Sequence, residues 1–112
     1  MNLKQRLDKR GSFSKLSKEY LVRFTPEAAH FISRLHPDNK RIIRNALEDL
    51  RRAPYAGDDL QDELAEFKSF KPGKFRIIYT VDDDHRFIQV FYVGHRRDVY
   101  DQFRLLLAKL KP

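Results

Sequence analysis

The segment from residue 72 to residue 94 constrains the fold more than any other part of the sequence. It begins with Pro-Gly, a pair that suits the centre of a type II turn. The run RFIQVFYV is apolar on both faces, which is typical of a central strand, and the polar turn DDDH separates it from the run KFRIIYTV. In KFRIIYTV the alternation places four residues on one strand face, namely Phe75, Ile77, Tyr79 and Val81. The segment therefore predicts an antiparallel β-hairpin near the centre of a sheet.

Two helix patterns precede this hairpin. Thr25 can cap the first helix and Pro26 suits its first position, and the second helix restarts at Pro37. The apolar stripe of the first helix is Ala28, Phe31, Ile32 and Leu35, and that of the second is Ile42, Ile43, Ala46, Leu47 and Leu50. The short connection at His36 predicts that the two helices form a helical hairpin.

The remaining segments complete the predicted order β-α-α-β-β-β-α. YLVRF at 20–24 indicates a strand, 53–59 a loop, and 64–71 a strand with a weaker pattern. A closing helix follows from Asp98, with Val99, Phe103, Leu106, Leu107 and Leu110 on one face. We expect an α+β fold, in which an antiparallel meander sheet packs against the helical hairpin. One domain is predicted over residues 19–112, after a basic N-terminal extension at residues 1–18.

The charge balance favours polyanionic partners. The formal net charge is +7, so nucleic acid, a ribosome surface or an acidic protein could each bind the chain. The chain has no cysteine, which excludes disulfides and thiolate metal sites and favours a cytoplasmic location. No apolar run is long enough to span a membrane, and no secretory signal pattern is present, so no membrane association is expected.

Metal chemistry and serine hydrolysis are not predicted. The four histidines fall in four different predicted elements, and no nucleophile elbow occurs, so no metal or cofactor is expected. The tripeptide His-Pro-Asp at 36–38 also occurs in J-domains, but those are all-helical. Here a strand precedes it and strands follow, so it indicates a helix start instead.

A set of basic residues comes from two neighbouring segments. If the strands pair, the set converges on one sheet edge, although a solvated face is the simpler explanation for any single lysine. Arg76 is unusual because it lies inside an apolar run, where it must meet a carboxylate, a phosphate or water. Together with Arg96 it could contact a phosphate bidentately. The hairpin supplies Lys68, Lys71, Lys74 and Arg76, and the segment after residue 93 supplies His95, Arg96, Arg97 and Tyr100.

Such a set suits RNA cleavage without a metal. The 2′-OH attacks the adjacent phosphorus, a base takes its proton, cations stabilise the phosphorane, and an acid protonates the 5′ leaving oxygen. Crowded positive charge lowers the pKa of tyrosine and of lysine, which favours the forms that accept protons. Basic residues around Tyr100 would then serve the chemistry as well as binding.

Two stretches, LQDELAEFKSFKPGKFRIIY and VGHRRDVY, resemble the RelE/ParE superfamily of type II toxin–antitoxin toxins. The resemblance covers roughly residues 20 to 110 in order and length. It implies a ribosome-dependent endoribonuclease that cuts mRNA, with Arg76, Arg96, Tyr100, Lys68 and Lys71 as catalytic residues. Lys74, Arg97 and His95 are then RNA-binding, and no cofactor is required.

The resemblance also implies a cognate acidic antitoxin, besides the ribosome and mRNA. Two alternatives remain open, a ParE-type inhibitor of DNA gyrase and a non-catalytic member that binds only its antitoxin. The spacing from Arg96 to Tyr100 is shorter than in some members, so Tyr100 is expected about one helical step from their tyrosine. The extension at 1–18 could contact RNA or the ribosome, pack on the sheet, or do neither.

Overall fold

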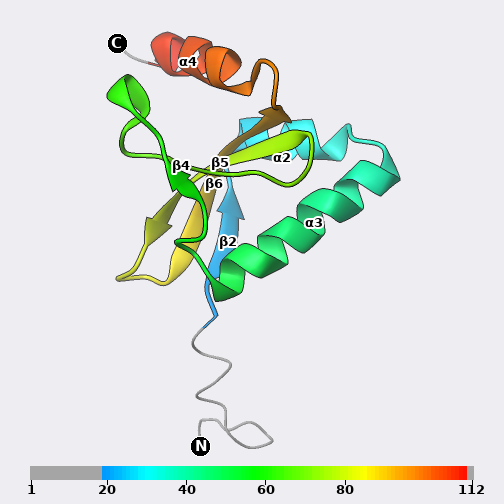
Figure 1. Cartoon of the computed structure of the whole chain (residues 1–112), viewed down its shortest axis with the longest axis vertical. Helices are drawn as coiled ribbons and strands as arrows, with labels where there is room; N and C mark the ends of the chain where they lie inside the picture. The colour runs from blue at the N-terminus through cyan, green and yellow to red at the C-terminus, as the bar shows by residue number, and fades with distance from the viewer. Residues whose placement is uncertain (1–18, 111–112) are drawn as a thin grey trace, which may run out of the picture.

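The computed structural model describes residues 19–110, so the predicted extension at 1–18 lies outside the described residues (Figure 1). The order of the elements follows the predicted one, except that a short strand and a 3₁₀ turn lie between the second helix and the meander. The elements are β2 (Leu21–Phe24), α2 (Pro26–Ser33), α3 (Pro37–Arg52), β3 (Asp58–Asp59), a 3₁₀ turn η1 (Asp62–Leu64), β4 (Lys68–Phe70), β5 (Phe75–Asp82), β6 (Phe87–His95) and α4 (Val99–Leu110).

One mixed sheet holds the five strands of the described residues in the order β2-β6-β5-β4-β3. The meander β4-β5-β6 is antiparallel, which confirms the hairpin prediction. The sheet as a whole is mixed, because β2 runs parallel to β6, from Leu21 opposite Phe87 to Phe24 opposite Val90. The α2–α3 hairpin carries the chain across the sheet, and the meander then returns β6 beside β2 in the same direction. The predicted loop at 53–59 also contains β3, which pairs with β4.

Helices cover both faces of the sheet (Figure 1). The predicted hairpin of α2 and α3 packs on one face, where Ile43 and Leu50 meet Ile77, Tyr79 and the apolar residues of β6. The closing helix α4 packs on the other face, where the core consists of Leu64, Phe67, Ile78, Val99 and Phe103. We call these the α3 face and the α4 face. Within the described chain, no helix is long and apolar enough to cross a membrane.

A β-bulge in β6 resets which side chains face the core. Ile78 lies opposite Tyr92 and Tyr79 opposite Val90, which leaves Phe91 as the extra residue. As a result Val90 and the residue three positions on, Val93, both reach the α3-face core. Thr25 anchors this bulge, because its hydroxyl donates to the Phe91 carbonyl at 2.9 Å and accepts from the Ala28 N–H at 3.2 Å.

Replacing Thr25 with valine should destabilise the fold. The variant keeps the side-chain shape but loses both the helix cap and the bond to the bulge, so the free energy of unfolding should fall by about 1–2 kcal/mol. Urea unfolding monitored by circular dichroism measures this change. Thr25→Ser retains the hydroxyl and should recover most of the loss, and equal stability of the valine and serine variants would contradict the assignment.

Candidate functional site

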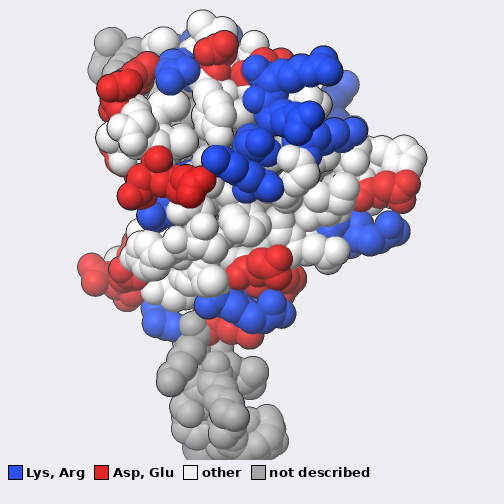
Figure 2. All heavy atoms as spheres, in the orientation of Figure 1, with Lys and Arg blue, Asp and Glu red and all other residues white. Residues whose placement is uncertain are grey.

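Five cations gather where β5 begins and β6 ends. Figure 2 shows Lys and Arg side chains concentrated over the β4–β5 turn and the β6–α4 connection. Two backbone features bring the segments together: Arg76 lies opposite Gly94 in the β5–β6 ladder, and the Arg96 N–H donates to the Lys74 carbonyl at 2.8 Å. We call this surface the basic edge, and its residues are Lys71, Lys74, Arg76, Arg96 and Arg97.

The two arginines predicted for phosphate binding have no carboxylate partner among the described residues. Arg76 is half-buried, and its Nη1 donates to the carbonyls of Gly73 at 2.9 Å and Phe75 at 2.7 Å. These carbonyls hold the guanidinium beside the turn without neutralising its charge. Arg96 is exposed at the adjacent strand end. Both cations are therefore available to an anion.

Tyr100 is positioned by a close approach of α4 to the sheet and by a buried hydroxyl. A Cβ on Gly94 would come within 2.8 Å of the Val99 side chain, so this glycine permits α4 to begin directly against β6. The Tyr100 hydroxyl then hydrogen-bonds Ser69 Oγ at 2.9 Å. Ser69 is fully buried and is the one buried polar residue of the described chain. Sequence reasoning missed Ser69, since a serine between two strand residues carries no distinguishing signal.

Lys71 joins this group but is paired with an acid. Its Nζ lies 2.8 Å from a carboxylate oxygen of Asp58 on β3, and this hydrogen bond is the main reason why the pKa of Lys71 is raised. Tyr100 raises the same pKa and Arg76 lowers it, so both lie close enough to act on this lysine. Our expectation that crowded cations lower the pKa of a lysine here is wrong for Lys71, because the unforeseen strand β3 brings Asp58 against it.

Lys68 lies on the opposite face of the sheet from Tyr100. It stands opposite Tyr79, whose side chain belongs to the α3-face core, whereas the next residue, Ser69, faces α4. The Lys68 Nζ pairs with Asp59 at 2.6 Å and lies 5.1 Å from the ring centre of Tyr55. The structure therefore does not bring Lys68 together with Tyr100.

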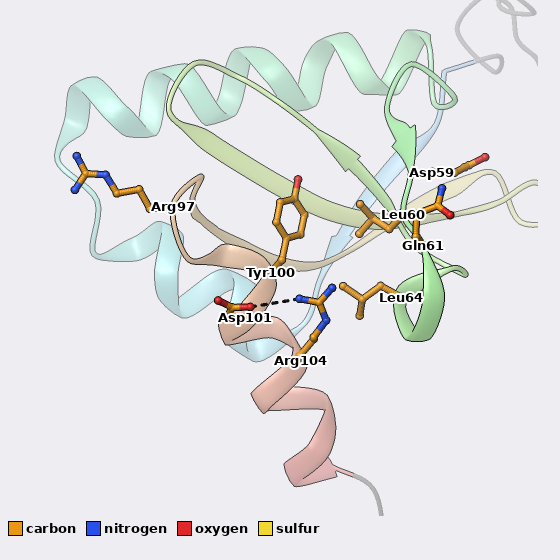
Figure 3. Close-up of a pocket in the computed structure, with 8 residues that line it drawn as sticks. All are labelled: Asp59, Leu60, Gln61, Leu64, Arg97, Tyr100, Asp101 and Arg104. Carbon is orange, nitrogen blue, oxygen red and sulfur yellow. Dashed lines mark hydrogen bonds and ion pairs between the residues drawn. The ribbon is translucent and has the colours of Figure 1, made fainter.

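The three residues predicted to bind RNA lie around the basic edge. His95 stands opposite Phe75, with its ring edge-on at 6.3 Å, and its Nδ1 accepts the Arg97 N–H at 3.3 Å. Lys74 lies over the same phenylalanine, with Nζ 5.5 Å from the ring centre. Figure 3 shows the Arg97 guanidinium extending away from Tyr100. In the described part of the chain, no three His, Asp or Glu residues cluster in a way that could hold a metal ion.

The pairing of Asp58 with Lys71 can be tested by titration. Lys71 lowers the pKa of the Asp58 carboxyl below its ordinary value of 3.8, chiefly through the hydrogen bond. The pair is therefore complete above that ordinary value and is lost as the pH falls through the lowered one. Carboxyl ¹³C shifts should show the Asp58 pKa returning to its ordinary value in Lys71→Met. Lys74→Met, in the same turn, should leave it lowered, and no change in Lys71→Met would contradict the pairing.

Comparison with known proteins identifies the family of this chain. Residues 14–100 match the model of the ParE toxin of the type II toxin–antitoxin system parDE. Toxin RelG of Mycobacterium tuberculosis is 36% identical over 83 residues, which are 72% of this chain and 95% of the relative. The chain belongs to the RelE/ParE family of type II toxin–antitoxin toxins. The resemblance inferred from the two sequence stretches is thereby confirmed.

Solved structures agree with this assignment. The toxin–antitoxin complex RelBE2 of M. tuberculosis contains a chain that is 35% identical, with a TM-score of 0.64 over 70% of this chain and 99% of that one. A variant of the Escherichia coli toxin RelE in the free state has a TM-score of 0.65 at 14% identity, over 83% and 99% of the two chains. The RelE likeness, at this identity, shows the shared fold alone.

Proposed function

We propose that this toxin cleaves mRNA on the ribosome, without a metal, and so arrests translation. The observation that carries the proposal is the pairing of two cations with a positioned phenol. Arg76 and Arg96 have no carboxylate partner in the described chain. Tyr100 is held on the buried hydroxyl of Ser69, and Tyr100 and Arg76 both lie close enough to Lys71 to act on its charge. A surface that served only for solubility would not need a tyrosine fixed by a buried serine.

The residues of the basic edge can perform each part of a 2′-OH attack. Arg76 and Arg96 would bind the non-bridging oxygens of the scissile phosphate and stabilise the dianionic phosphorane. The bond from the 2′-oxygen to phosphorus forms as the bond to the 5′-oxygen breaks, which gives a 2′,3′-cyclic phosphate and a 5′-hydroxyl. Tyr100 would carry one of the two proton transfers. Lys71 can join the phosphate once that anion competes with Asp58.

The proposed partners follow from the same surface. An antitoxin with an acidic segment would cover the basic edge by charge complementarity and block the phosphate site. The relatives include toxins that are solved in complexes with their antitoxins, such as RelBE2 and the intact E. coli RelBE complex. With ribosome-bound mRNA as its proposed substrate, the active toxin would work in the cytoplasm.

Inhibition of DNA gyrase is the second candidate function, because the matching family model is that of ParE toxins. In that case the basic edge would contact a protein and no RNA would be cut. Controlled expression in bacterial cells separates the two. Translation arrest, with mRNA cut within codons, supports the endonuclease, whereas DNA damage with intact mRNA would replace it with the gyrase proposal. Growth without arrest would leave the non-catalytic member as the remaining alternative.

A further inference from the structure

Most of the positive charge of this chain lies in the N-terminal extension. Residues 19–110 contain sixteen Lys and Arg and fifteen Asp and Glu, so their formal net charge is only +1. The extension at residues 1–18 contains six Lys and Arg and one Asp, so it carries +5 of the total of +7. The long-range attraction of the chain for a polyanion therefore comes mainly from the extension.

Within the described residues, the structure concentrates the available positive charge at the basic edge. The basic edge holds five cations, so the rest of residues 19–110 carries eleven Lys and Arg against fifteen Asp and Glu, a net charge of −4. Figure 2 shows Asp and Glu side chains interspersed with the others over the rest of this face. RNA that leaves the basic edge thus meets a surface with no net attraction for phosphate.

The extension joins the domain at the end of the sheet opposite the basic edge. It precedes β2, which begins at Leu21 beside Phe87, the first residue of β6, whereas β6 ends at the basic edge (Figure 1). The eight residue steps from Phe87 to His95 correspond to roughly 26 Å, at about 3.3 Å for each step. The two cationic parts of the chain are therefore joined to opposite ends of the sheet.

The acidic turn between β5 and β6 is the alternative partner for the extension, because it lies at the same end of the sheet. Residues 82–84 are three aspartates. Asp82 pairs with His85 at 3.0 Å, and Asp83 accepts the hydroxyls of two tyrosines. Even with all three carboxylates ionised, the turn offers −3 against the +5 of the extension. Most of the attraction for an external polyanion would remain.

Resting on the proposed function, we propose that the extension binds the backbone of ribosomal RNA, apart from the mRNA at the basic edge. Lys and Arg contact phosphates without reading sequence, and the like charge of the basic edge directs the extension to a different RNA segment. Two attachments to one ribosome strengthen each other through effective concentration. Residues 1–13 lie outside the family match, so this contact would be an addition to the family domain.

The test measures binding of the full chain to vacant ribosomes over a series of salt concentrations. Each phosphate contact contributes about 0.7 to the slope of log affinity against log salt, so replacing all six extension cations with Gln should reduce the slope by about 4. Lys4→Gln with Arg6→Gln should reduce it by about 1.4. The matched control, Arg44→Gln with Lys109→Gln, removes the same charge from exposed positions of α3 and α4 and should leave the slope unchanged.

Deproteinised ribosomal RNA is the second probe, on which the six-residue variant should lose the same slope. An unchanged slope on ribosomes would overturn the proposal, because the extension then contacts its own domain or nothing. A loss on ribosomes that is absent on RNA would also overturn it, since the partner is then a ribosomal protein. An equal loss in the control would show that net charge alone matters, which contradicts a contact made by the extension.

Failure of the proposed function can be told apart from failure of this contact. Vacant ribosomes carry no mRNA, so binding is measured without cleavage. If the wild type leaves translated mRNA intact but loses its salt slope when the extension is neutralised, the endonuclease is wrong and the RNA contact stands. If it cuts mRNA and the slope does not depend on the extension, the endonuclease stands and the RNA contact is wrong.

Discussion

Alanine at Arg76 or at Arg96 should abolish growth arrest and leave the fold intact. Each arginine offers charge-assisted hydrogen bonds to a phosphate, and loss of one such contribution to a charged transition state costs roughly 10²–10³ in rate. Neither side chain pairs with a carboxylate in the described chain, so its removal leaves no buried acid uncompensated. Cell growth after induction and cleavage of mRNA on purified ribosomes measure the effect.

Arg44→Ala provides the matched control for this prediction. Arg44 is exposed, as Arg96 is, but it lies on α3, away from the basic edge. It should keep full toxicity. Thermal unfolding of each variant shows whether the domain still folds. Unchanged toxicity of Arg96→Ala would remove Arg96 from the site, and an unfolded Arg76→Ala would indicate that its bonds to the Gly73 and Phe75 carbonyls are structural.

Tyr100→Phe should reduce cleavage by roughly 10²–10⁴, the usual contribution of a positioned acid or base. The variant should also unfold more easily, by about 1–3 kcal/mol, because the fully buried Ser69 hydroxyl loses its partner. Single-turnover cleavage on ribosomes and urea unfolding report the two effects separately.

A double variant separates the chemistry of Tyr100 from its packing. Ser69→Ala removes the buried hydroxyl, so Tyr100→Phe combined with Ser69→Ala should regain most of the stability. Cleavage should remain low, because the phenol is still missing. If the double variant cleaves as fast as the wild type, Tyr100 acts only through packing, and the proton transfer must belong to another group.

Local sequence patterns were sufficient to predict most of the helices and strands. The alternation of β5 predicted its core face, and the structure buries Phe75, Ile77 and Tyr79 on the α3 face. Thr25 and Pro26 begin α2 as their conformational preferences predict, with the Thr25 side chain accepting the Ala28 N–H. These features depend on neighbours in sequence, and short-range preferences therefore decide them. The family followed from two other local patterns, the stretches LQDELAEFKSFKPGKFRIIY and VGHRRDVY.

Pairing between segments that are distant in the sequence decided the features that local patterns did not predict. The direction of β2 depends on where the α2–α3 crossover returns the chain, and no pattern within residues 20–24 encodes it. The association of Ser69 with Tyr100 and of Asp58 with Lys71 likewise joins residues from separate elements.

The eight candidate site residues show the same division. Sequence reasoning selected Arg76, because an arginine inside an apolar run needs an anion or water as a partner, and Arg96 beside the strand end. The family resemblance added Tyr100 to them as a catalytic residue. Only the tertiary structure showed which face of β4 each of the adjacent residues Lys68 and Ser69 takes. The physical reason is the two-residue period of a strand: the pairing of β4 with β5 fixes which face each residue takes, and a shift of one residue would exchange them.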